Sequence, residues 1–169
     1  DLLLLRMKEE TSSDKCVVFS QWIEVLDIVS NALYSNGLNF VMCSKKQDFS
    51  PRKNLSRFRS DPSVQVLLLP INLGAEGLDL VHANHVFLLE PLINKSTEIQ
   101  AINRCDRLGQ CKTTRVVKYI IRGTIEERIL NQSEELSAPR RLHSRMKKKD
   151  RLKDEIHDLD EVRFLLTGN

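Results

Sequence analysis

The chain has 169 residues, of which 41 % are hydrophobic and 29 % charged, so it can bury the core of one domain and carry a short appendage. The net charge is only +3, and the sequence has no run of about 18 apolar residues, which excludes a membrane-spanning segment. The four cysteines form no C-x-x-C pair and have no histidine at ligand spacing, so neither a zinc site nor a disulfide framework is indicated.

Strand and helix signals alternate along the chain after a polar N-terminal stretch. The short apolar run 16–19 predicts a strand that is buried on both faces, because it lacks the alternation of a half-solvated sheet. Further strands are expected at 38–43, 64–69, 85–89 and 114–121. Helical spacing and capping residues predict helices at 22–36, 51–60, 95–108 and 124–136, with a Gly-containing loop at 70–84. This alternation predicts an α/β fold, a parallel sheet with helices on both faces.

The last part of the chain differs in composition. Residues 137–149 contain six Lys or Arg and no acidic side chain, which predicts a flexible basic linker. From residue 150 on, apolar residues recur at helical spacing and predict an amphipathic helix that packs on the domain or on a partner. We therefore expect an N-terminal linker at 1–14, a domain at 15–136 and a linker with a helix at 137–169. Because no initiator Met is present, we expect a piece of a longer protein.

The segment Gln100–Gln110 (QAINRCDRLGQ) is the most informative stretch of the chain. It places Arg104 and Arg107 three residues apart, on one face of the expected helix 95–108, which should break at Gly109. A guanidinium binds two phosphate oxygens at once and stays charged at any physiological pH. Across a cleft from a bound nucleotide, it can stabilise the charge on a transferring phosphoryl group. For an isolated R-x-x-R pair, a solvated helix face is the alternative.

Three further segments follow expected strands, where an open parallel sheet binds its ligands. They are Ser20-Gln21-Trp22, residues 70–79 and Glu90-Pro91. In the second, Gly74 and Gly77 permit close approach of backbone N–H groups to a phosphate, or form a plain turn. Asp79 could accept a hydrogen bond from a ribose hydroxyl or cap the next turn. No G-x-x-x-x-G-K-[ST] loop and no Asp-Glu pair after a strand is present, so we expect the domain to work against another one.

Four segments, in this order and spacing, resemble the second RecA-like lobe of the Swi/Snf-type DNA-dependent ATPases, a branch of the superfamily-two helicases. They are Val17–Trp22, Gly74–Leu80, Gln100–Gln110 and Gly123–Ile129. Other stretches look most like a sub-family of nuclear E3 ubiquitin ligases with an ATPase core, linked to polyubiquitination of the sliding clamp during DNA-damage tolerance. These stretches are 25–33, 67–70 and 89–94. The resemblance covers roughly residues 15–132.

The resemblance implies which residues carry function. ATP and Mg²⁺ would be bound mainly by a first lobe that this chain lacks, and Arg104 and Arg107 would face that nucleotide, Arg107 as the finger on its γ-phosphate. The residues of the nucleotide-facing network would be Gly77, Asp79 and Gln100. The residues towards the DNA backbone would be Ser20, Gln21, Asn72 and Gly74. The implied partners are the first lobe, double-stranded DNA and, through the parent protein, chromatin, the sliding clamp and a ubiquitin-conjugating enzyme in the nucleus.

Two departures from the family pattern leave two hypotheses open. Asp106 stands between the motif arginines where the family usually has His, and this carboxylate could pair with Arg107 or simply orient it. Pro70-Ile71 replaces residues that often carry hydroxyl groups. The first hypothesis is a lobe of a working DNA-dependent ATPase and translocase. The second is a catalytically decayed lobe that serves as a platform for protein or chromatin interaction.

Overall fold

The computed structural model describes residues 14–43, 51–75 and 77–137. They fall into two compact units. The first contains the described residues up to Glu90 together with Ser96–Tyr119, and the second contains Pro91–Lys95 and the described residues from Ile120 on. The basic linker and amphipathic helix expected after Ser137, and nearly all of the expected N-terminal linker, lie outside the described residues. Within the described part of the chain, no helix has the length and apolar character needed to cross a membrane.

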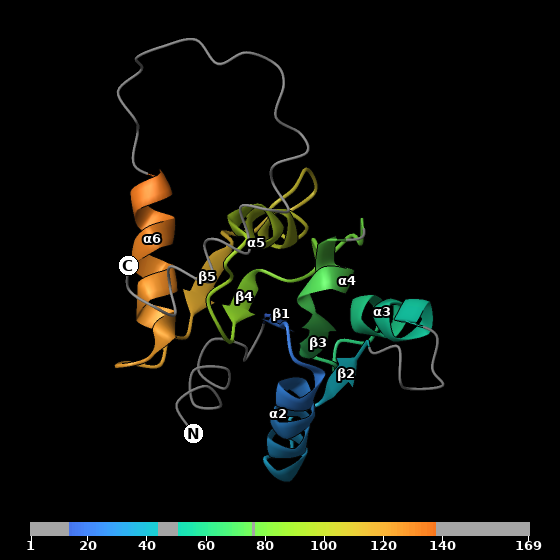
Figure 1. The fold of residues 1–169 in the computed structure, drawn as a ribbon. Coiled ribbons are helices and arrows are strands. Elements are labelled where there is room, and N and C mark those ends of the chain that lie inside the picture. The colour runs from blue at the N-terminus through green and yellow to red at the C-terminus, as the bar shows by residue number, and fades with distance from the viewer. Residues whose placement is uncertain (1–13, 44–50, 76, 138–169) are drawn as a thin grey trace. The chain divides into compact units, whose positions relative to one another are not determined.

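Five strands of the first unit form one sheet in the order β2-β3-β1-β4-β5 (Figure 1). The strands are β1 (Cys16–Ser20), β2 (Phe40–Met42), β3 (Val66–Pro70), β4 (His85–Leu88) and β5 (Arg115–Lys118). Every neighbouring pair is parallel. The central strands β1, β3 and β4 are buried along nearly their whole length, as continuous apolar runs predict. The predicted parallel sheet is therefore confirmed.

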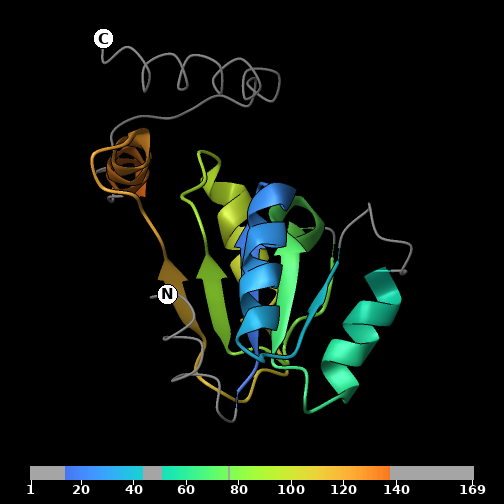
Figure 2. The ribbon, with the colours of Figure 1, turned by 90° about the horizontal axis from the view of Figure 1, so that it is seen from below.

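Helices cover both faces of this sheet. They are α2 (Ile23–Ser35), α3 (Pro51–Ser60), α4 (Ile71–Ala75) and α5 (Lys95–Ile102). From β1 the chain crosses β3 to reach β2 at one side of the sheet, and the later strands β3, β4 and β5 then follow one another towards the other side. Because parallel crossovers are right-handed, this reversal puts α2 on one face and α3, α4 and α5 on the other. Figure 1 shows α2 on its own side, and Figure 2 shows it in front of the strands.

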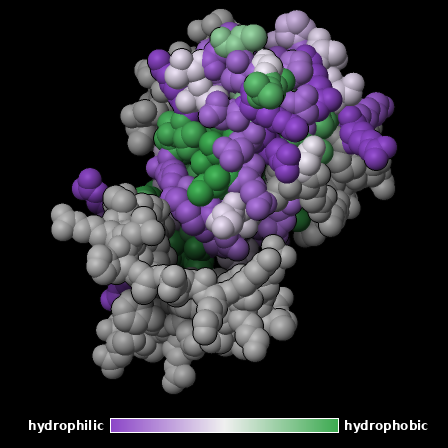
Figure 3. Space-filling view, turned by 90° about the horizontal axis from the view of Figure 1, so that it is seen from above, coloured by the Kyte–Doolittle hydropathy of each residue, from purple (hydrophilic) through white to green (hydrophobic). Residues whose placement is uncertain are grey.

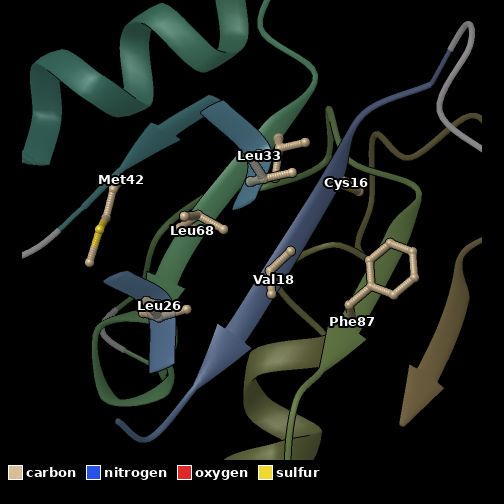
Figure 4. Close-up of a cluster of buried hydrophobic side chains, with 8 residues drawn as sticks. Cys16, Val18, Leu26, Leu33, Met42, Leu68 and Phe87 are labelled. Atoms are coloured by element: carbon tan, nitrogen blue, oxygen red, sulfur yellow. The ribbon is translucent and has the colours of Figure 1, made fainter. Parts of the chain in front are cut away.

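The core beneath α2 holds the strands in register. Leu26 and Leu33 lie seven residues apart on α2, and both side chains are fully buried against the sheet. The cluster, drawn in Figure 4, consists of Cys16, Val18, Leu26, Leu33, Met42, Val66, Leu68 and Phe87. Burying one such leucine contributes about 1.5–3 kcal/mol. This packing fixes four of the five strands, and with them the positions of the loops at both edges of the sheet.

The structure corrects two predicted elements. The helix expected at 95–108 ends at Ile102, and turns follow it. Backbone hydrogen bonds there span three residues instead of four: Arg104 N donates to Ala101 O at 3.2 Å and Cys105 N to Ile102 O at 2.9 Å. The loop expected at 70–84 contains a single helical turn, α4, directly after β3. Its five residues include a glycine and are too few to show a helical period in the sequence.

The second unit contains α6 (Ile125–Ser137), which begins as the sequence predicts. Thr124 caps it, since its Oγ1 accepts from the Glu126 N–H at 3.2 Å. Glu126 Oε2 accepts from the Ile121 N–H at 2.7 Å. The acidic residue that reaches back is therefore Glu126, where the predicted capping box has Glu127.

Candidate functional site

The three segments expected to meet at the carboxyl edge of the sheet do meet there. Ser20 and Pro70 are register partners at the ends of β1 and β3. The Gln21 backbone N–H donates to a carboxylate oxygen of Glu90, which follows β4. Glu90, expected only as part of a segment at a strand end, thus acts through its carboxylate on the loop after β1. This hydrogen bond fixes the loop after β1 against the loop after β4.

Ser20 and Gln21 occupy different environments at this edge. Ser20 is 1 % exposed, and its Oγ accepts from the Trp22 N–H at 3.0 Å and donates to the Trp22 carbonyl at 3.2 Å. Its hydroxyl is thus occupied by the turn that it shapes. The Gln21 side chain is exposed. Of the two residues, Gln21 is the one placed to contact a ligand.

The remaining residues expected at this edge lie on α4. Asn72 is exposed in its first turn, and Gly74 lies in the same helix. Ile71, between Pro70 and Asn72, is 2 % exposed and packs inward. The edge therefore presents side-chain amides from Gln21 and Asn72, while Pro70 and Ile71 supply no hydroxyl.

The arginine segment lies at the opposite edge of the sheet. Leu80 N donates to Arg104 O at 3.1 Å, and Gln110 Nε2 donates to Ala83 O at 2.9 Å. Ala83 lies two residues before the start of β4. Because α5 follows β4 and runs back along the sheet, it carries the chain to the amino ends of the strands. The arginines and the residues expected to face DNA are therefore not brought together.

Gly77 and Asp79 lie on the path from α4 back to this amino edge. Gly77 has φ of +82°, a backbone conformation that favours glycine. Asp79 is exposed, and its Oδ1 accepts from the Val81 N–H at 3.4 Å, which matches the turn-capping alternative. Arg59 of α3 donates to the Asp79 carbonyl at 2.6 Å, and its Nη2 lies 4.0 Å from the Asp79 carboxylate. Arg59 thus holds this loop, a role that the sequence did not indicate.

Asp106 does not pair with Arg107. Asp106 Oδ1 accepts a long hydrogen bond of 3.5 Å from Thr114 Oγ1. Arg107 is exposed, and among the residues that the structure describes its guanidinium has no ion pair. Arg104 is half-buried, and Gln100 is exposed on α5. The guanidinium of Arg107 is therefore available to an anion from outside the domain.

Gln110 fixes the arginine segment. Besides Ala83 O, its Nε2 donates to Val81 O at 3.0 Å and to Cys105 O at 3.2 Å, and its Oε1 accepts from the Lys112 N–H at 2.9 Å. Gly109, with φ of +107°, allows the turn that presents this side chain. This role of Gln110 was not predicted from the sequence, although its place at the end of the motif is a signal.

Cys105 closes the inner side of this segment. It is fully buried, and burial raises the pKa of its thiol to about 12, so it packs as a small apolar group. Leu108 is 99 % exposed and Ile99 is 47 % exposed. Figure 3, which views the side of the molecule that carries α3, α4 and α5, shows hydrophobic patches within a hydrophilic surface. In the described ranges, no group of three or more His, Cys, Asp or Glu side chains could hold a metal ion.

Comparison with known proteins gives the family context. The family described as helicase conserved C-terminal domain matches residues 1–109. E3 ubiquitin-protein ligase SHPRH of Homo sapiens is 43 % identical over 126 residues, which are 75 % of this chain and 7 % of that protein. DNA repair protein rad8 of Schizosaccharomyces pombe is 39 % identical over 132 residues, 78 % of this chain and 12 % of that protein. The chain thus spans only a small part of the curated relatives that it matches.

A solved structure confirms the fold. The C-terminal part of the Fun30 ATPase domain superposes with a TM-score of 0.74 at 23 % identity, covering 98 % of this chain and 53 % of that one. The predicted RecA-like architecture is therefore confirmed, and so is the resemblance to the ubiquitin-ligase sub-family that residues 25–33, 67–70 and 89–94 indicate.

Proposed function

The chain belongs to the helicase conserved C-terminal domain family, and from this premise we propose that it supplies arginine fingers to ATP bound on a first RecA-like lobe. One observation carries the proposal. The backbone of the arginine segment is fixed by Leu80 and Gln110, while the guanidinium of Arg107 is exposed and has no ion pair among the described residues. A guanidinium on a rigid, externally facing turn is what an arginine finger requires.

The chemistry follows from this placement. ATP and Mg²⁺ would be bound mainly by the first lobe, whose closure brings the γ-phosphate towards Arg107. Charge that spreads over the transferring phosphoryl oxygens is then stabilised, an effect of about 10³–10⁵ in rate for arginine fingers. Arg104, Gln100, Gly77 and Asp79 complete the nucleotide-facing network in this proposal. The exposed Leu108 supports a protein contact beside it, since an apolar side chain gains by burial in an interface.

The opposite, carboxyl edge is proposed to contact duplex DNA. Gln21 and Asn72 present amides that can bind backbone phosphates, with Gly74 and Ser20 shaping the same edge. Because one packed core joins both edges, closure over ATP at one edge would move the DNA-contacting edge with it. Such contacts position the protein without reading bases. They predict a duplex affinity that is indifferent to base sequence.

The relatives suggest the wider setting. SHPRH is named as an E3 ubiquitin-protein ligase and rad8 as a DNA repair protein. We propose that the parent of this chain is a nuclear protein of the same kind, with double-stranded DNA, chromatin, the sliding clamp and a ubiquitin-conjugating enzyme as partners.

One observation favours the interaction-platform alternative. Pro70 and the buried Ile71 give the carboxyl edge no hydroxyl donor, and the Ser20 hydroxyl is occupied within its own turn. The contact of Asp106 with Thr114 favours the working enzyme, because the carboxylate does not neutralise Arg107.

DNA-stimulated ATP hydrolysis by a parent protein with both lobes tests the proposal. We expect turnover that rises with duplex DNA, and none from this chain alone. Asp106→His in the parent distinguishes the alternatives. If the parent is inactive and Asp106→His restores turnover, the lobe is a decayed motor kept as a platform. Turnover by the isolated chain would overturn the division of the site between two lobes.

A further inference from the structure

A charged pair joins α5 to the sheet, with its carboxylate buried and its ammonium group partly exposed. Glu98, in the first turn of α5, is 3 % exposed. Lys118, the last residue of β5, donates from Nζ to Glu98 Oε1, and its side chain is 25 % exposed. The pair joins the helix that precedes the arginine segment to the carboxyl end of a strand whose position is set by pairing with β4.

Glu98 belongs to the buried stripe that sets how α5 is rotated about its axis. Glu98 and Ala101 of α5 and Cys105 in the turns that follow it stand at i, i+3 and i+7, and all three are buried. Ala101 is small and apolar, so it resists rotation weakly. The hydrogen bond from Lys118 acts on the long side chain at the start of the stripe. The direction of that bond therefore favours one rotation of α5 about its axis.

The rotation of α5 is transmitted to the arginines through the backbone. Asn103 N donates to Ile99 O at 2.9 Å, and Arg104 N donates to Ala101 O at 3.2 Å. Asp106 N donates to Ile102 O at 3.0 Å. These bonds continue from the last turn of α5 into the arginine segment without a break, so a change in the rotation of the helix changes where Arg104 and Arg107 are aimed.

Stability alone does not account for this pair. Burying the Glu98 carboxylate and partly burying the Lys118 ammonium costs desolvation energy, and an apolar pair of similar volume often stabilises a protein as well or better. What an ion pair adds is a directional bond with one preferred geometry. We propose that Glu98 and Lys118 are positioning residues for the proposed phosphoryl transfer: they fix the orientation of α5 so that Arg107 reaches the γ-phosphate. This inference rests on the proposed function.

The test uses a parent protein with both lobes and duplex DNA. Glu98→Leu keeps the approximate volume and removes the acceptor, whereas Glu98→Gln keeps an acceptor for Lys118. Leu33→Ala, in the core on the other face of the sheet, is the control that destabilises the fold without touching α5. Two quantities are measured: kcat and KM for ATP, and the affinity for MgADP–aluminium fluoride relative to MgADP–beryllium fluoride. The first complex resembles the transition state and the second resembles bound ATP.

We expect Glu98→Leu to lower kcat roughly 10–100-fold while KM changes less than about threefold, because the arginine is misplaced only for the transition state. The relative affinity for the aluminium fluoride complex should fall by a similar factor. Glu98→Gln should retain kcat within about threefold. Leu33→Ala should lower the melting temperature and change neither kcat nor the affinity ratio, which separates positioning from stability.

Each other outcome has a defined meaning. If Glu98→Leu folds and leaves kcat and the ratio within about threefold, while Arg107→Ala lowers kcat, the positioning inference fails and the proposed function stands. If Arg107→Ala leaves kcat unchanged, the proposed function fails, and the positioning inference for Glu98 and Lys118 fails with it. Should Glu98→Leu not fold, Lys118→Arg keeps both charges and alters the donor geometry. The same loss of kcat then supports the inference, and an unchanged kcat overturns it.

Discussion

Gln110 is the residue whose replacement most directly tests how the arginine segment is held. Gln110→Leu keeps a side chain of similar size and removes the amide that joins Cys105 to the chain before β4. Three backbone carbonyls lose a donor and the Lys112 N–H loses an acceptor. The two amide hydrogens serve three carbonyls, so about three full hydrogen bonds are lost, each with a net contribution of about 1 kcal/mol. We expect the free energy of unfolding to fall by about 3 kcal/mol.

The measurement is urea unfolding of this chain, followed by far-UV circular dichroism and by the fluorescence of Trp22, its one tryptophan. Gln100→Leu is the matched control, because it makes the same change at an exposed position of α5. The control should shift the free energy of unfolding by less than about 0.5 kcal/mol. A loss below about 1 kcal/mol for Gln110→Leu, or equal losses for the two variants, would refute this account of the segment.

Two further predictions concern ionisable groups. The hydrogen bond from Lys112, and after it that from Asn84, lowers the pKa of Asp14 from 3.8 to about 2. The ionised Asp14 carboxylate therefore stabilises the fold above about pH 4, and this stabilisation is lost as the pH falls to about 2. In Asp14→Asn the fall in the free energy of unfolding over this pH range should be smaller by about 1 kcal/mol, a value that allows for screening by water. An unchanged acid dependence of urea unfolding in the variant would contradict this. Burial raises the pKa of Cys43 to about 11 and that of Cys105 to about 12, whereas Cys111 is exposed. Ellman's reagent at pH 8 should therefore label one thiol rapidly in the folded chain and all four in urea, and any thiol that still reacts rapidly after Cys111→Ser would show that the burial is wrong.

The sheet was predictable because its signal is local. A strand covered on both faces must be apolar along its length, and the runs at 16–19, 64–69 and 85–89 satisfy that condition without reference to anything distant. The end of α5 was not predictable in this way. No residue between Ile102 and Gly109 is a strong helix breaker, and the helix ends shortly before Arg104, whose carbonyl accepts from the N–H of Leu80, a residue much earlier in the chain.

The candidate site was likewise predictable only in its local features. Its motif residues could be found from spacing, but their placement at two opposite edges depends on α5 running back along the sheet. Arg59 and Gln110 act on backbone carbonyls, which no side-chain pattern reveals. Glu98 did leave a signal: an acidic residue at the start of an i, i+3, i+7 stripe whose other members, Ala101 and Cys105, are of the kind that is buried.

The central claim is that Arg107 acts on ATP held by another lobe. The most direct test is the rate of ATP hydrolysis at saturating ATP and duplex DNA by a two-lobe parent carrying Arg107→Ala. The control is Arg122→Ala, an exposed arginine outside the motif. We predict a fall of about 10³-fold or more for Arg107→Ala, with ATP binding largely kept, and no change for the control. A rate within about threefold of the unmodified parent would contradict the claim.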